Sequence, residues 1–366
     1  MKTIRLAVLI LAAIVSLGAD AQEKVVTNYS IESATKMIDF VKKAADGTMP
    51  SEKDWKDLFA TDGYRMAFAE RKDSLWWQQS IRNAFLLVFD NSKQSQVDSI
   101  VALPIEKRDG QFFFVYNFNN MKNNITELHR FIHQADFAKM FIKGDKLARK
   151  HLPKQWRNIQ PAFQKFYFVA WDPESRAWNG IFLDINSFYA EGKKGMIRAL
   201  GHEIHHQYFA AILEQLYTQD SQDPAIIAIY RMQIEGTADL INKLELPAKT
   251  LGVYDKAVVD VYNKDYLSSP KVLAELDSLT CGYIDKQLTR KQYQEAQYCA
   301  HMDGHTTGDY MTFLIRRESG LKAVIECLGD FPAFVRLYNQ AARKAGTYVF
   351  SDKFVRHIEK MTEKMK

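Results

Sequence analysis

Apolar residues in the first part of the chain recur at steps of three and four, the spacing that places them on one face of a helix. A second such run begins near Asp73, and a third extends over 125–135. The first run lies between Ser30, a candidate cap, and Gly47, and it contains Ile31, Ala34, Ile38, Val41 and Ala45. The spacing therefore predicts a mostly helical region up to about Pro153.

The pattern changes after residue 160. Residues 166–171 are aromatic or β-branched, and residues 181–185 form a second apolar run that follows the turn formers Asn179 and Gly180. Runs of this length and composition predict two strands, which we expect to pair as a hairpin. After Gly192 the spacing is helical again to the C-terminus. The whole pattern predicts an α+β fold that is predominantly α-helical, with a small sheet.

The beginning of the chain has the composition of a secretory signal peptide. Lys2 and Arg5 precede an apolar stretch over 6–17, and small residues follow at Ala19 and Ala21. We expect cleavage near Ala21 and export to the periplasm or out of the cell. No later segment is long and apolar enough to span a bilayer. The remainder divides into a helical N-terminal region, 22–160, and a second region, 161–366.

The charge balance and the cysteines exclude some classes of function. The 366-residue chain has a formal net charge of only +5 and no long block of Lys and Arg, so nothing favours nucleic acid binding. Cys281, Cys299 and Cys327 fit no zinc-binding spacing. They are either three buried thiols or one disulfide with a thiol left over, and neither arrangement supplies the chemistry.

One short run of residues can carry catalysis, and it lies within the helical segment after Gly192. His202 and His206 in His202-Glu203-Ile204-His205-His206 are four residues apart, on one side of a helix. Two imidazoles so placed can bind one Zn²⁺ ion, and Glu203 beside them can act as the general base for the water that the metal activates. His205 is a neighbouring or surface imidazole, or alternatively a direct ligand.

A catalytic zinc needs a third protein ligand and an open position for water. Glu235 is the candidate, in a helical stretch that we expect to begin near Pro224 and to end before Pro247. Asp239, one turn further on, could accept the free ring N–H of a ligating histidine. Gly236 and Ala238 would let this helix lie close to the metal helix. The alternative is an exposed acidic helix face.

The other histidines of the N-terminal region are weaker candidates. His129, His133 and His151 are predicted to be surface or core histidines, because no carboxylate motif accompanies them in the sequence.

The combination of H-E-x-x-H with Glu235 and Asp239 in a later helix resembles the gluzincin zinc metallopeptidases. More closely, it resembles a group of bacterial proteins described as zinc-dependent peptidases of unknown function. The resemblance covers roughly residues 166–327, so it implies a zincin-like catalytic region within 161–366, with the sheet beside the metal helix. It also implies that 181–185 is an edge strand that pairs with extended substrate.

A peptidase also needs a donor for the oxyanion that forms on the attacked carbonyl. The resemblance implies a Tyr or His from a later helix, placed before a Gly and a Met that match Gly308 and Met311. His305 is then the first choice, Tyr310 the second and His301 the third. The alternative is that this segment is a polar loop that caps a helix without touching substrate.

These observations predict an exported zinc metallopeptidase that binds one catalytic Zn²⁺ through His202, His206 and Glu235 and acts on a peptide or protein. Glu203 would deprotonate the water that attacks the amide carbonyl and would pass the proton to the leaving amine. Two alternatives stay open. One is a non-catalytic exported helical binding protein with a degenerate or structural metal site, and the other is a zinc hydrolase of non-peptide amides. The sequence does not indicate an oligomeric state.

Overall fold

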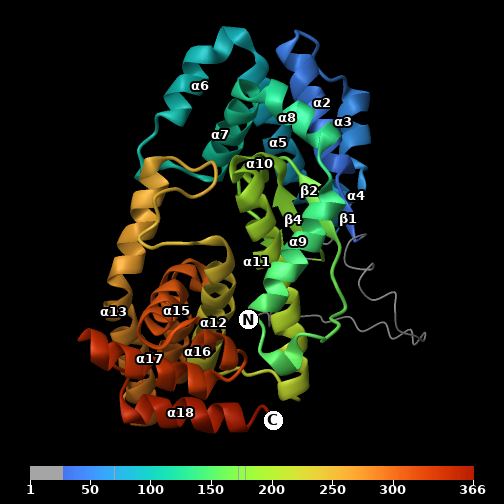
Figure 1. Ribbon diagram of the computed structural model, residues 1–366. Coiled ribbons are helices and arrows are strands. Elements are labelled where there is room, and N and C mark those ends of the chain that lie inside the picture. Colours follow the sequence, from blue (N-terminus) through green and yellow to red (C-terminus); the bar gives the residue numbers. More distant parts are fainter. Residues whose placement is uncertain (1–27, 70, 172, 178) are drawn as a thin grey trace.

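The computed structural model describes residues 28–366, apart from residues 70, 172 and 178. The predicted signal peptide, 1–21, lies outside the described residues. Helices account for most of the fold and a single small sheet for the rest (Figure 1). The predicted α+β class, predominantly α-helical, is confirmed.

The helices between β1 and β2 in the sequence lie mostly in the upper part of Figure 1. They are α2 (Glu32–Ala45), α3 (Glu52–Phe59), α4 (Asp62–Phe68), α5 (Ser74–Phe89), α6 (Gln94–Val101), α7 (Gly110–Asn123), α8 (Ile125–Gln134) and α9 (Phe137–Lys150). Short 3₁₀ turns connect some of the elements: η1 (Asn91–Lys93), η2 (Ile105–Lys107), η3 (Lys154–Trp156), η4 (Gln294–Cys299) and η5 (His301–Gly304).

The sheet has the strand order β1-β2-β4-β3, and its strands are β1 (Tyr29–Ser30), β2 (Phe166–Val169), β3 (Arg176–Ala177) and β4 (Ile181–Asp184). β1 and β4 both run parallel to β2, whereas β3 is antiparallel to β4. The predicted hairpin of 166–171 with 181–185 is therefore wrong. Every residue of β2 and β4 is buried, as is usual for parallel strands that are covered on both faces.

The expectation that 181–185 forms an edge strand is also wrong. β4 pairs with β2 along its whole length and with β3 at Ile181 and Phe182. Ile185 already belongs to the helix that follows. The local sequence shows an apolar run, but it does not show that two residues of the connecting loop return to cover its outer side.

A continuous chain of elements leads from the sheet to the C-terminus. It consists of α10 (Ile185–Ala190), α11 (Gly192–Leu216), α12 (Pro224–Asn242), α13 (Lys256–Ile284), α14 (Arg290–Tyr293), α15 (His305–Ser319), α16 (Leu321–Glu326), α17 (Phe331–Ala345) and α18 (Asp352–Glu363). Two predicted helices are confirmed: α11 follows Gly192, and α12 begins at Pro224 and ends before Pro247.

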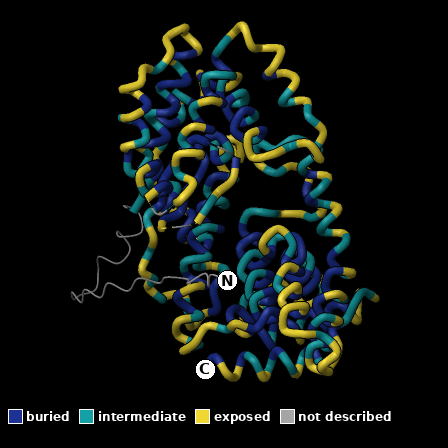
Figure 2. Tube along the Cα trace, turned by 180° about the vertical axis from the view of Figure 1, so that it is seen from behind, coloured by how far each residue is buried: buried dark blue, intermediate teal, exposed yellow. Residues whose placement is uncertain are grey.

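Buried apolar residues from both parts of the chain form one cluster, which extends from α2 to α18. Figure 2 shows the buried positions along the inner faces of the helices, with exposed positions at the periphery. α11 connects the two parts, because it packs against both α9 and α12. No helix within the described residues has the length and apolar character of a membrane span.

Candidate metal centre

α11 brings its two metal-ligand candidates to the same side. His202 and His206 are one turn apart, and their Nε2 atoms are 3.0 Å from each other. His202 is buried and His206 is largely so, whereas Glu203, the next residue along the helix, is partly exposed. Gly201 lets α11 pack closely against α9 and α12. A Cβ at that position would lie 3.0 Å from Ile241 of α12 and 3.3 Å from the backbone of Gly144 in α9.

α12 supplies the third ligand candidate. The helix begins at Pro224, and the side chain of Asp223 accepts hydrogen bonds from the first free N–H groups. Three turns later Glu235 Oε2 lies 3.6 Å from His202 Nε2 and 3.4 Å from His206 Nε2. Two ligands about 2.0–2.1 Å from a zinc ion at the tetrahedral angle would be about 3.3–3.4 Å apart. The three separations, 3.0, 3.4 and 3.6 Å, lie within about 0.3 Å of that spacing.

The carboxylate of Glu235 has an unusual environment. Its Oε2 atom is buried and accepts no hydrogen bond from the described residues, although three imidazole rings surround it. Burial opposes ionisation, but the neighbouring His206 and His305 outweigh it and lower the pKa of Glu235 to about 2. The same carboxylate raises the pKa of His206 against the effect of burial. An anionic oxygen without a donor, facing two converging nitrogens, fits a divalent cation such as zinc.

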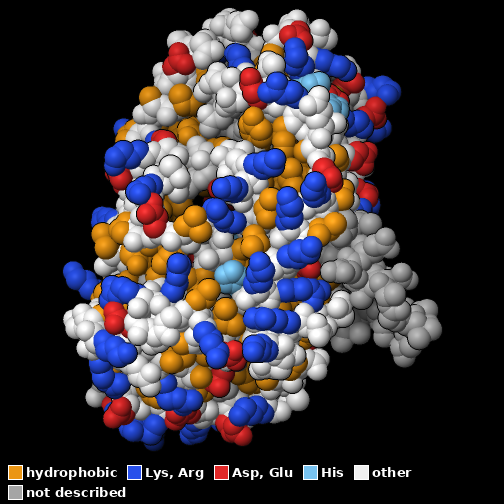
Figure 3. Space-filling view, viewed as in Figure 1, with side chains coloured by type: hydrophobic (Ala, Val, Ile, Leu, Met, Phe, Trp, Pro, Cys, Tyr) orange, Lys and Arg blue, Asp and Glu red, His pale blue; other side chains and the backbone are white. Residues whose placement is uncertain are grey.

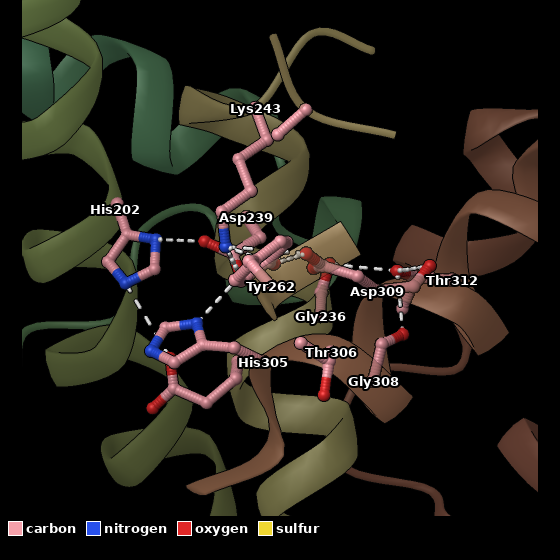
Figure 4. Close-up of polar contacts among 12 residues, drawn as sticks. His202, Gly236, Asp239, Lys243, Tyr262, His305, Thr306, Gly308, Asp309 and Thr312 are labelled. Atoms are coloured by element: carbon pink, nitrogen blue, oxygen red, sulfur yellow. Dashed lines mark hydrogen bonds and ion pairs between the residues drawn. The ribbon is translucent and has the colours of Figure 1, made fainter. Parts of the chain in front are cut away.

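Asp239 holds two of the imidazole rings. Its Oδ1 atom is 3.1 Å from His202 Nδ1, and its Oδ2 atom is 2.7 Å from His305 Nδ1. A histidine whose Nδ1–H points at a carboxylate presents Nε2 as the free lone pair, which is the form a metal needs. Figure 4 shows Asp239 between the two rings.

A buried network behind Asp239 was not anticipated from the sequence. Lys243 Nζ donates to Asp239 and lies 3.3 Å from Asp309 Oδ2, and Tyr262 donates to Asp309 (Figure 4). Lys243 and His305 outweigh the cost of burial and hold the pKa of Asp239 well below its usual range. Burial next to that carboxylate raises the pKa of Asp309 well above its usual range. The Lys243 spacing, four residues after Asp239 on one helix face, is the signal that could have indicated it.

His305 is the first residue of α15, and it faces the metal-ligand candidates. Its Nε2 atom is 3.4 Å from Glu235 Oε2. Burial lowers its pKa, but Asp239 and Glu235 outweigh that effect and raise the pKa to about 9. Gly304 before it has φ +112°, and a Cβ there would lie 2.3 Å from the carbonyl oxygen of Arg231. The Gly304–His305 pair is thus held directly against α12.

The other two oxyanion candidates lie differently. Tyr310 is five residues after His305, which places it about 140° further around α15. Its hydroxyl is hydrogen-bonded to Thr347 at 2.8 Å, and its ring packs on Tyr266. His301 lies in η5, outside α15. Of the three candidates, the structure brings His305 together with the ligand candidates.

His205 contributes no atom to the group of converging ligand atoms. It is fully buried, and burial holds its pKa well below the usual value, with smaller contributions from nearby histidines. It is therefore not a surface imidazole. The group of side chains with converging ligand atoms consists of His202, His206 and Glu235.

The expected role of Gly236 is wrong in one respect. A Cβ at Gly236 would lie 2.4 Å from the carbonyl oxygen of Gly308, and one at Gly308 would lie 2.2 Å from that of Met232. Gly236 therefore allows close contact of α12 with α15, not with the metal helix. The sequence shows a small residue, but not which neighbouring helix it faces.

The cysteines take no part in the site. Cys281, Cys299 and Cys327 are all free thiols, and burial raises the pKa of each of them. Of the two arrangements that the sequence left open, the structure has three thiols.

The site thus offers two imidazoles and one carboxylate as ligands, with a glutamate beside them and a third imidazole opposite. Comparison with curated proteins and with solved structures gives no match. The model of one protein family matches residues 55–347, most of the chain. The chain therefore belongs to the family described as "Putative zinc dependent peptidase (DUF5700)".

Proposed function

We propose that the protein is an exported metallopeptidase of the gluzincin type, which binds one zinc ion through His202, His206 and Glu235. The observation that carries the proposal is the convergence of these three ligand atoms at close to tetrahedral spacing. One of them is a buried carboxylate oxygen that accepts no hydrogen bond from the part of the chain that the structure describes. The family match independently supports zinc dependence and peptide hydrolysis.

When bound, zinc would polarise the substrate carbonyl and lower the pKa of water. Glu203 follows His202 on α11, so its carboxylate is carried beside the ligand set and not into it. There it accepts a proton from the attacking water and delivers it to the leaving amine. The peptide nitrogen is a poor leaving group until it is protonated, so the proton taken from water must reach it. One carboxylate that performs both transfers is sufficient.

His305 completes the arrangement from the opposite side. Asp239 fixes its Nδ1 atom, so Nε2 faces the space next to Glu235. In that position it donates a hydrogen bond to the oxygen of the tetrahedral intermediate. Lys243 keeps Asp239 anionic, and Asp309 in turn accepts a hydrogen bond from Lys243, so both act as positioning residues for His202 and His305.

The Glu203→Gln variant tests the mechanism. We expect it to retain zinc, since none of the three ligands changes, and to lose peptide hydrolysis by at least about a hundredfold. Metal analysis and cleavage of a denatured protein substrate would be measured on the same sample. Glu214→Gln, at an exposed position on the same helix, is the matched control and should be fully active.

Two results would redirect the proposal. Full hydrolysis by Glu203→Gln would remove Glu203 as the base. Zinc binding by the wild type without cleavage of any peptide, but with hydrolysis of small amides, would indicate a non-peptide amide as substrate.

A further inference from the structure

A second group of side chains that could bind a metal ion lies on the surface, on α2 and α8. The centre described above lies on α11 and α12. His129 and His133 are one turn apart on α8, and Asp39 faces them from α2. The Nε2 atoms of the two histidines lie 3.3 Å and 3.1 Å from the same carboxylate oxygen, Asp39 Oδ1. Figure 3 shows histidine side chains at the surface over α8 and α2.

This group repeats the ligand set of the first site. Each consists of two histidines four residues apart on one helix and one carboxylate from another helix. The ring centroids of His129 and His133 are 4.6 Å apart, the same separation as for His202 and His206. The carboxylate that the sequence did not reveal is supplied by tertiary packing of α2 on α8.

Simple ion pairing explains this geometry less well than coordination does. Two imidazoles that served only as hydrogen-bond donors would use both oxygens of a carboxylate more favourably than one. Here both Nε2 atoms are directed at Oδ1, and the three side chains are between 37% and 43% exposed. Solvent access leaves the remaining coordination positions of an ion open to water.

One difference indicates that the second group is not catalytic. The residue after the first histidine is Glu203 in the first site and Arg130 in the second. Arg130 cannot accept a proton from water, since the guanidinium stays charged at any physiological pH.

We propose that Asp39, His129 and His133 form a second divalent-metal site, which binds zinc or a similar ion that prefers imidazole ligands. The bound ion connects α8 to α2. The site does not depend on the catalytic proposal, because it shares no residue with the first centre. An ion that binds the folded chain there stabilises it by mass action.

Zinc titration of a chain with a disabled first site tests this proposal. In a His202→Ala/Glu235→Ala background, we expect isothermal titration with zinc alone to show one equivalent, and added zinc to raise the melting temperature. Asp39→Asn and His133→Ala, each added to that background, should abolish both effects. Asp39→Asn has nearly the same shape as the native side chain, so it should leave the fold intact, which circular dichroism would verify.

Glu127→Gln is the matched control, because it removes an exposed negative charge from the same helix without altering a ligand. It should bind zinc as the background does. The proposal is overturned if the background binds no zinc, or if Asp39→Asn and His133→Ala bind it undiminished.

Discussion

Asp239 and Asp309 are chemically identical side chains whose pKa values are shifted in opposite directions in this fold. Asp239 accepts a hydrogen bond from Lys243 and lies against two histidine rings, and these neighbours hold its pKa well below the usual range. Burial beside that carboxylate raises the pKa of Asp309 well above the usual range. Lys243 and the Tyr262 hydroxyl both donate to Asp309 and join it to the network.

Isosteric substitutions should therefore differ sharply. The raised pKa of Asp309 disfavours its charged form, and Asp309→Asn replaces it by an uncharged amide of similar shape. We therefore expect a change of less than about 1 kcal/mol in the free energy of unfolding. Asp239→Asn leaves Lys243 buried without its anion and should cost about 3–5 kcal/mol. It should also weaken zinc binding by about 10–100-fold, because both histidines lose their acceptor.

Urea unfolding and zinc affinity, measured on both variants, check this prediction. Equal losses would show that Asp309 carries its own charge and that the network is arranged otherwise.

At this scale the sequence predicted much of the site. His202, His206, Glu235 and Asp239 follow from helical spacing, and the structure brings all four together. Tyr262 and Asp309 were not found, because they lie on other helices and acquire meaning only through packing. Asp39 was missed for the same reason, which is why His129 and His133 looked like ordinary surface histidines.

The crossing of α12 with α15 fixes the position of Glu235. α12 and α15 cross with backbone against backbone at Gly236, Gly304 and Gly308. Thr312 of α15 reinforces the crossing by donating to the carbonyl of Gly236 at 3.0 Å (Figure 4). Because Gly236 directly follows Glu235, any widening of this crossing moves the candidate ligand Glu235.

Gly308→Ala tests the crossing. The new methyl group would meet the rigid backbone of Met232, so we expect a loss of about 1–3 kcal/mol of stability or more, with reduced zinc content. Gly110→Ala, in the first turn of α7 where the nearest neighbour atom is 3.8 Å away, should be neutral or slightly stabilising. Chemical denaturation of both variants gives the comparison, and similar stabilities would contradict the close crossing.

Elements were predicted well where a pattern is local and poorly where pairing is distant. α2, α5, α11 and α12 follow from spacing and from flanking residues such as Asp73 and Pro224. The predicted cap of α2 is wrong, because Ser30 belongs to β1 and the helix begins after Ile31. The parallel pairing of β2 with β4 and the addition of β1 depend on residues far apart in sequence. β3 and β1 have two residues each, too few for any periodicity to show.

Two contacts connect the N-terminal helices to the C-terminal ones across the molecule. Arg108 donates twice to Asp255, at 2.9 Å and 2.7 Å, and Tyr116 donates to the carbonyl oxygen of Val253 at 2.7 Å. Asp255 also caps α13. The hydrogen bonds from Arg108 hold the pKa of Asp255 below its ordinary value.

The sign of the resulting pH dependence follows from linkage. A carboxyl whose pKa is lowered by folding stabilises the protein above its unfolded pKa, about 3.9. That contribution is lost as the pH falls through the folded value. Because Asp255 is partly exposed, solvent screening limits the contribution to about 1 kcal/mol.

Asp255→Asn should therefore destabilise the protein by about this amount at pH 7 and by progressively less as the pH approaches 3. Asparagine is also a good helix cap, so the substitution isolates the ion pair. The control is Asp260→Asn, which removes only an exposed pair with Lys256 and should change little. The free energies of unfolding of the wild type and the variants, measured over the acidic pH range, test this prediction. A difference between Asp255→Asn and the wild type that does not vary with pH would refute the linkage.

The pairing of β1 with β2 sets the order in which the sheet can form during synthesis. Its two residues are synthesised long before their partner, Phe166–Tyr167, because α2 to α9 lie between them in the sequence. β1 must therefore remain without its strand partner until β2 has been synthesised. The sheet is thus completed late, as expected for strands that pair across a long separation in sequence.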